Sequence, residues 1–179
     1  DGMRLYGGTD RGALIWWNLK NADNAELVQV AQAFEDERAI TALGMALGDI
    51  SVVIGDERGG LQSWFPVPTG RASGARELQR IHVLSGHESA VRRIAASMRD
   101  KTILSEDANG SIHMDYLTSE RRLQRLSSNT PFGPFGFTGN GQGLVALDSQ
   151  DHLYVWHIHN PHPEISWRTL FGKVWYENY

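Results

Sequence analysis

Short apolar stretches separated by glycine, aspartate and other turn residues run along most of the chain. Three of them are rich in apolar and β-branched residues, and each is followed by a turn: 51–55, 101–105 and 143–147. Another stretch that predicts a strand precedes each of these, at 39–47, 90–98 and 132–140. Alternating apolar and polar residues predict outer strands at 27–34, 77–84 and 121–127. The pattern therefore predicts β-strands joined by short turns.

One sequence frame occurs four times along the chain. Each copy has Asp or Thr, then Gly or Asp three positions later, Leu or Ile two positions after that, and usually Trp three positions further on. The copies are TDRGALIWW (9–17), DERGGLQSW (56–64), DANGSIHMD (107–115) and DSQDHLYVW (148–156). Gly and Asp tolerate a positive φ angle, and an Asp side chain accepts hydrogen bonds from nearby amides. Each frame thus predicts a tight hairpin turn, followed by a strand whose Leu or Ile faces the core.

Each repeat is predicted to be an antiparallel meander of four strands, about 40 to 50 residues long. A helix over 22–34 is the alternative at one place, but Val28, Val30 and the position of the repeat favour a strand. The fold class is therefore all-β, a partial β-propeller of about three to four antiparallel four-stranded blades. Two complete meanders are expected at about 40–83 and 90–127, between one that lacks its first strand and one that lacks its last.

The incomplete outer meanders have a consequence for assembly. Closed propellers need at least four blades, and an unpaired sheet edge can pair with another chain. The chain is therefore expected either to form a homodimer through its open blade edges or to belong to a larger ring. Since residue 1 is Asp and no signal peptide precedes it, a fragment of a longer protein is the preferred interpretation.

Composition excludes several classes of protein. The 179 residues are 41% hydrophobic and 21% charged, as in ordinary globular domains, and the net charge of −4 argues against a nucleic-acid partner. The basic pairs at 92–93 and 121–122 are too sparse to form a basic stripe. The absence of cysteine excludes disulfides, cysteine-based zinc sites and thiol nucleophiles. No window approaches 18 consecutive apolar residues, the length of a membrane-spanning helix.

The repeat resembles that of WD-repeat β-propellers. SGHESAV at 85–91 matches the Gly-His motif that opens such a repeat, and Asp107 occupies the turn position of the same unit. The resemblance implies that His87 forms a hydrogen bond toward Asp107 and stabilises the blade. This unit departs from the pattern because Asp115 stands where Trp is expected, and the other units have no Gly-His pair. Asp56 and Asp148 are the matching turn residues, and Trp17, Trp64 and Trp156 are expected in the core or between blades.

The composition changes after Ile158. Pro161 and Pro163 are expected to stop the sheet, and residues 161–179 are predicted to be an aromatic linker after the blades of residues 1–160. Trp, Tyr and Lys together are typical of a segment at a membrane interface. A capping segment that lies across the blades is the alternative from the residues alone.

The tail HPEISWRTLFGKVWYENY is similar to the junction before the transport domain of PstC-like permeases, the membrane subunits of phosphate-specific ABC importers. Some of these permeases carry a WD-repeat-like insert between their first two transmembrane helices. The resemblance implies a domain on the periplasmic side of the inner membrane, joined to the membrane through the parent chain. Its implied role is a non-catalytic docking surface for other importer subunits or for the phosphate-binding protein. A free-standing cytosolic WD-repeat scaffold is the alternative.

Candidate chemistry is sparse. His157, His159 and His162 lie close together and are weak candidates for a divalent metal site, against three polar residues at a strand end. The glycine-rich loop at 139–143 precedes a strand rather than a helix, so a hairpin turn is expected there instead of a phosphate site. No Gly-x-Ser-x-Gly motif is present. The sequence therefore predicts no catalytic residue and no cofactor.

Two aromatic residues lie outside the repeat pattern. Trp16 and Phe65 each adjoin a repeat tryptophan, on the opposite face of the strand. Because side chains alternate between the two faces of a strand, these two residues are the expected candidates for an exposed contact surface.

Overall fold

The computed structural model describes residues 3–21, 23–46, 48–70, 74–97, 99–126, 132–139, 141 and 143–157, and the backbone of 160–168. They form four antiparallel sheets, called blades 1 to 4 in chain order. Blade 1 consists of β1 (Arg4–Gly8), β2 (Ala13–Asn18) and β3 (Glu26–Gln32), and blade 2 of β4 (Ile40–Met45), β5 (Val52–Asp56), β6 (Leu61–Pro68) and β7 (Arg76–Leu84). Blade 3 consists of β8 (Val91–Ala96), β9 (Thr102–Asp107), β10 (Ile112–Tyr116) and β11 (Arg121–Leu126), with a 3₁₀ turn at Leu117–Ser119. Blade 4 consists of β12 (Phe132–Phe137), β13 (Gly143–Asp148), β14 (His152–His157) and β15 (Asn160–Arg168).

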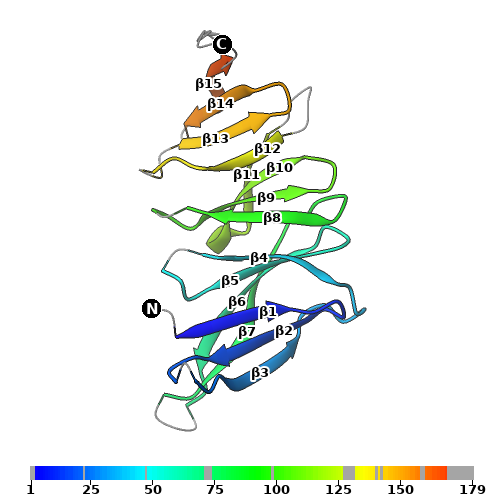
Figure 1. Ribbon diagram of the computed structural model, residues 1–179, viewed down its shortest axis with the longest axis vertical. Helices are drawn as coiled ribbons and strands as arrows, with labels where there is room; N and C mark the ends of the chain where they lie inside the picture. Colours follow the sequence, from blue (N-terminus) through cyan, green and yellow to red (C-terminus); the bar gives the residue numbers. More distant parts are fainter. Residues whose placement is uncertain are drawn as a thin grey trace.

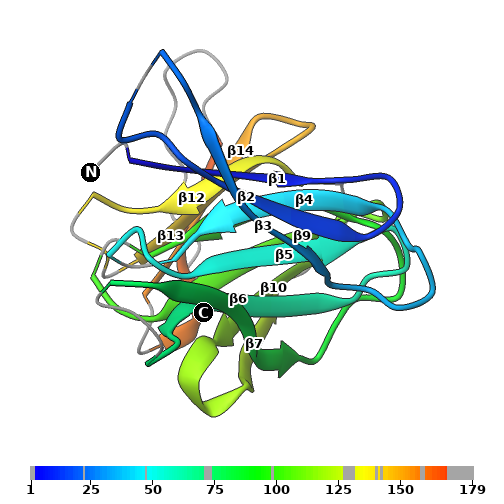
Figure 2. The same cartoon turned by 90° about the horizontal axis from the view of Figure 1, so that it is seen from below.

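The blades are stacked in chain order along the long axis of the molecule (Figure 1). Within each blade, every strand pairs with the next strand in the sequence. The first strands of blades 2, 3 and 4 contact one another, β4 with β8 and β8 with β12, and β1 of the three-stranded blade 1 contacts β4. Seen along the stack, the axes of β1, β4 and β5 are roughly aligned, with β4 and β5 antiparallel (Figure 2). This is the arrangement of successive propeller blades, so the all-β, partial-propeller prediction is confirmed.

The repeated frame forms the same turn four times. Thr9 and three aspartates each accept hydrogen bonds at one side-chain oxygen from the backbone N–H groups two and four residues later: Thr9, Asp56, Asp107 and Asp148. The residue three positions after each of these has a positive φ: Gly12, Gly59, Gly110 and Asp151. The turn predicted from the sequence is therefore present in all four blades.

Three apolar layers hold the blades together, one at each junction. Leu14 and Trp16 of blade 1 pack with Val52, Ile54 and other residues of blade 2. The second layer joins blades 2 and 3, and the third joins blades 3 and 4. Every residue of β5 and of β9 is buried, since blades 2 and 3 are each covered on both faces. Most of the apolar core thus lies between blades.

Each junction also has a hydrogen bond between blades. Gln29 of β3 pairs with the backbone of Leu78 in β7, accepting its N–H at 2.6 Å and donating to its carbonyl at 3.3 Å. Thr41 of β4 donates its hydroxyl to the carbonyl of Val91 at 2.6 Å. Arg93 donates to the carbonyl of Gly133 at 2.6 Å. These bonds fix the relative position of neighbouring sheets, which apolar contact alone leaves free to slide.

One of the two outer blades, blade 4, differs from the prediction. Blade 1 has three strands in the described part of the chain, as expected, but blade 4 has four, because β15 pairs with β14 along its length. The expectation that Pro161 and Pro163 would stop the sheet is therefore wrong. Proline is tolerated on an edge strand and at a bulge, and β15 is the last strand of its sheet, with register shifts beside Trp156. The linker predicted at 161–179 stays a prediction beyond Arg168, since residues 169–179 lie outside the described part.

Candidate functional site

A buried polar cluster lies between blades 2 and 3. His87, in the segment before β8, places Nε2 2.8 Å from Oγ of Ser105 and Nδ1 3.5 Å from Oδ2 of Asp107. Ser105 and Asp107 lie two residues apart on β9 and share one face of that strand. The backbone N–H of His87 donates to the carbonyl of Gly59 in the blade 2 turn, at 2.8 Å. His87 therefore connects the turn of blade 2, through its backbone, with β9 of blade 3, through its imidazole.

A second histidine lies flat against the first. The ring centroids of His87 and His113 are 3.8 Å apart, and their planes differ by 6°. Burial lowers the pKa of His87 from 6.5 to about 4, which the charge of Asp107 opposes in part. Burial also lowers the pKa of His113, to about 3, with the neighbouring imidazole and Arg122 adding to the effect. Both rings are neutral near neutral pH.

Asp115 takes the place of the missing repeat tryptophan in blade 3. Its side chain is fully buried and lies 3.0 Å from Nε of Arg122. The same guanidinium donates to the backbone carbonyls of Ser85 and Gly86, in the segment that leads to His87. Burial raises the pKa of Asp115, against the opposing charge of Arg122. The ion pair thus replaces the apolar contact that Trp64 and Trp156 make in blades 2 and 4.

The serine, histidine and aspartate have the residue types of a hydrolase triad, but a substrate cannot reach them. Ser105 is fully buried, and the His87 side chain has no exposed surface. A nucleophile must be within contact distance of the scissile bond, so this cluster stabilises the junction between blades instead of performing catalysis.

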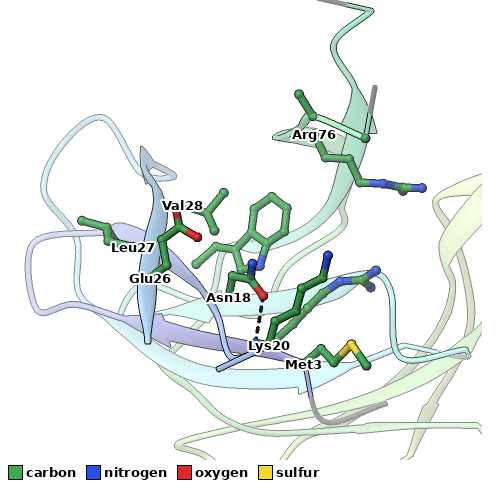
Figure 3. Close-up of a pocket in the computed structure, with 11 residues that line it drawn as sticks. Met3, Asn18, Lys20, Glu26, Leu27, Val28 and Arg76 are labelled. Carbon is green, nitrogen blue, oxygen red and sulfur yellow. Dashed lines mark hydrogen bonds between the residues drawn. The ribbon is translucent and has the colours of Figure 1, made fainter. Parts of the chain in front are cut away.

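A cavity of about 450 Å³ lies between blades 1 and 2, where their outer strands begin (Figure 3). One wall consists of the start of β1, the end of β2 and the start of β3, and the opposite wall is the start of β7. Its described lining contains Arg4, Lys20 and Arg76 together with one carboxylate, Glu26. The sequence gives no local signal for this cavity, because the three cations that line it are spread over 73 positions of the chain.

The structure corrects the prediction for Trp16. It is only 6% exposed and packs with Leu14 against blade 2, so the expectation that it belongs to an exposed surface is wrong. The reason is that, within the described part of the chain, blade 1 is covered on the face toward blade 2 alone, and that face carries Trp16 rather than Trp17. Trp64 and Trp156 are buried, and Trp17 is half-buried. Phe65 is half-buried beside a second cavity, so a contact role for it stays a prediction.

The structure describes only part of the predicted metal site of His157, His159 and His162. His157 is exposed, while His159 and the side chain of His162 lie outside the described residues. Across the described side chains, no group of three His, Asp or Glu residues is placed to hold a metal ion. In the same part of the chain no helix has the length and hydropathy needed to span a membrane.

Solved structures share this fold. The chain is similar to the C-terminal WD40 domain of Sif2, with a TM-score of 0.74 and 15% identity over 93% of this chain and 45% of that one. It is also similar to the computationally designed protein Ika8, with a TM-score of 0.69 and 18% identity over 93% of this chain and 46% of that one. The chain thus spans less than half the length of either protein. No family model and no curated protein matches the sequence.

Proposed function

We propose that this chain is one sector of a propeller ring that serves as a protein-binding scaffold without catalysis. The observation that carries this proposal is the open face of blade 1, on the side away from blade 2. Strand register places five apolar residues on that face: Leu5, Ile15, Trp17, Leu27 and Val30. Leu27 and Val30 are each 56% exposed. An exposed apolar patch of this kind marks an interaction surface.

The repeat shows what kind of contact the open face lacks. The last position of the frame faces the preceding blade, since Trp64 packs in the layer toward blade 1 and Trp156 in the layer toward blade 3. Trp17 holds the same position in blade 1 and lies half-buried on the open face. Four sheets of this chain cover less than half of each similar structure, so a ring of that size needs about as many blades again.

The proposed setting is the extracytoplasmic domain of a phosphate ABC importer permease, on the periplasmic side of the inner membrane. The resemblance of residues 161–179 to the junction in PstC-like permeases supports this setting. In this proposal the blades form a rigid surface beside the transport path and dock the phosphate-binding protein or another importer subunit. Transport itself belongs to membrane helices elsewhere in the parent chain.

The parent reading frame tests this setting. We expect a hydrophobic span of about 20 residues within a few tens of codons after Tyr179. A stop codon, or another soluble blade in place of the span, would contradict the permease proposal and leave the scaffold proposal intact.

A free-standing cytosolic scaffold is the second candidate, and one observation favours it. Ile165 lies within β15, which pairs with β14 as the last strand of blade 4. A tail that forms a strand, at least as far as Arg168, is expected of a scaffold more than of a loose extension toward a membrane. The same reading frame distinguishes the two candidates.

A further inference from the structure

The cavity between blades 1 and 2 has an excess of positive charge. Among the residues that the structure describes, Arg4, Lys20 and Arg76 line it against one carboxylate, Glu26. Neither Arg4 nor Lys20 forms an ion pair with any residue that the structure describes. Arg76 is held by a hydrogen bond of 3.2 Å to the carbonyl of Pro66. In a chain whose net charge is −4, this local excess favours an anionic ligand.

The cavity also offers an apolar wall and an unused donor. Leu27 and Val28 line it from the exposed start of β3. Trp16 forms part of the lining, is 6% exposed, and its indole Nε1 has no hydrogen-bond acceptor within the described part of the chain. A buried donor without an acceptor is costly. An apolar wall beside cations and a free donor matches a ligand that has both apolar groups and acceptor oxygens.

The walls favour an extended ligand. β3 and β7 are the last strands of their sheets, so each has an edge that no strand of its own sheet covers. The two strands are joined at Gln29 and Leu78. The cavity lies between the starts of the same two strands (Figure 3). Free strand edges accept extended peptides through backbone hydrogen bonds.

We propose that this cavity binds an extended acidic segment of a partner protein. Its carboxylates would lie near Arg4 and Lys20, and an apolar side chain between them would contact Leu27 and Val28. This inference rests on the proposed role as a protein-binding scaffold and adds the chemistry of the partner. It places the peptide site at the junction of blades 1 and 2, where Leu27 belongs both to the lining of the cavity and to the open face of the scaffold proposal.

Fluorescence polarisation with two labelled peptides tests the proposal. The probe is the acetylated pentapeptide Leu-Glu-Val-Glu-Leu, and its matched control has Lys in place of both Glu residues. We expect the acidic peptide to bind and the basic one not to bind. The double variant Arg4→Glu, Lys20→Glu should bind the acidic peptide at least about tenfold more weakly. Arg121→Glu changes an exposed cation of blade 3 and should leave binding unchanged.

Three outcomes would overturn the inference: no binding of the acidic peptide, equal binding of both peptides, or equal binding by the double variant and the Arg121→Glu control. Full displacement of the peptide by inorganic phosphate at equal concentration would also overturn it, in favour of a small-anion site. Val30→Asp alters only the open face of blade 1 and should bind the peptide normally. Peptide binding and assembly through that face can therefore fail independently.

Discussion

The imidazoles of His87 and His113 lie face to face at the junction of blades 2 and 3, with their centroids 3.8 Å apart. His87 comes from the segment before β8, and His113 from β10, two residues before the buried Asp115. Both rings are buried and neutral, so the junction contains a stacked aromatic pair that can also take up protons. That property makes the stability of the stack depend on pH.

Acid is expected to weaken the fold. Burial holds the pKa of His87 at about 4 and that of His113 at about 3, whereas both titrate near 6.5 in the unfolded chain. Below pH 6.5 the unfolded state therefore binds more protons than the folded state. The free energy of unfolding should fall by about 1.4 kcal/mol per pH unit for each histidine, down to about pH 4. Urea unfolding at several pH values measures this slope.

The variant His113→Phe separates the histidines from the carboxylates that also titrate in acid. It keeps an aromatic ring against His87 and removes one titrating group. The slope below pH 6.5 should be reduced by about half of the histidine contribution. An unchanged slope would mean that the stacked pair is not the source of the acid sensitivity.

Removing Arg122 should strongly destabilise the protein. In Arg122→Met the carboxylate of Asp115 stays buried without its partner, which costs about 3–5 kcal/mol. The double variant Asp115→Leu, Arg122→Met should recover most of this loss, because it removes both charges together. The neighbouring Arg121 is exposed, so Arg121→Met should change stability by less than about 0.5 kcal/mol. Chemical denaturation of the four proteins checks the series, and equal effects at the two arginines would contradict it.

Two glycines with positive φ should differ greatly in their tolerance of alanine. At Gly59, with φ of +93°, a Cβ would lie 2.2 Å from the carbonyl oxygen of His87. The clash is with backbone, so Gly59→Ala should cost at least about 3 kcal/mol. At Gly70, with φ of +68°, a Cβ would meet no atom of the described residues within 4 Å, and Gly70→Ala should cost only about 1 kcal/mol. Thermal unfolding of the two variants tests the contact between the blade 2 turn and His87.

Much of the fold follows from local chemistry that the sequence displays. Asp56, Asp107 and Asp148 predict their turns because a short acceptor beside Gly or Asp favours one backbone conformation. The side of each strand that is buried depends instead on the neighbouring blade. For this reason the sequence predicts the wrong environment for Trp16, although the frame that contains it predicts the turn correctly. The prediction that Pro161 and Pro163 stop the sheet fails for a similar reason. Proline is tolerated on an edge strand, and the sequence alone does not show that β15 lies at the edge of its sheet.

The candidate sites are harder to predict because they join distant segments. Asp115 at the position of a repeat tryptophan was a visible signal, with Arg122 seven residues later as its partner. His113 gave no such signal, since its contact with His87 depends on how the segment before β8 folds back. The cavity between blades 1 and 2 is formed by the starts and ends of strands that lie far apart in the sequence.

The two faces of the stack should respond differently to the same substitution. Val53 is fully buried between blades 2 and 3, whereas Val30 lies on the open face of blade 1. Val53→Asp should cost more than about 4 kcal/mol, since it buries an unpaired charge. Val30→Asp should stay within about 0.5 kcal/mol of the wild type. Denaturant unfolding of the two variants compares them, and a similar loss in both would mean that the face of blade 1 is covered within the chain itself.

The most direct test of the central claim is sedimentation velocity of the wild-type chain and of Val30→Asp over a wide range of concentration. An apolar face built to contact another blade should make the wild type associate as its concentration rises, and Val30→Asp should remain monomeric, because the charge would have to be buried in the contact. If the wild type is a monomer at every concentration, or if Val30→Asp associates equally well, the open face of blade 1 is not an assembly surface.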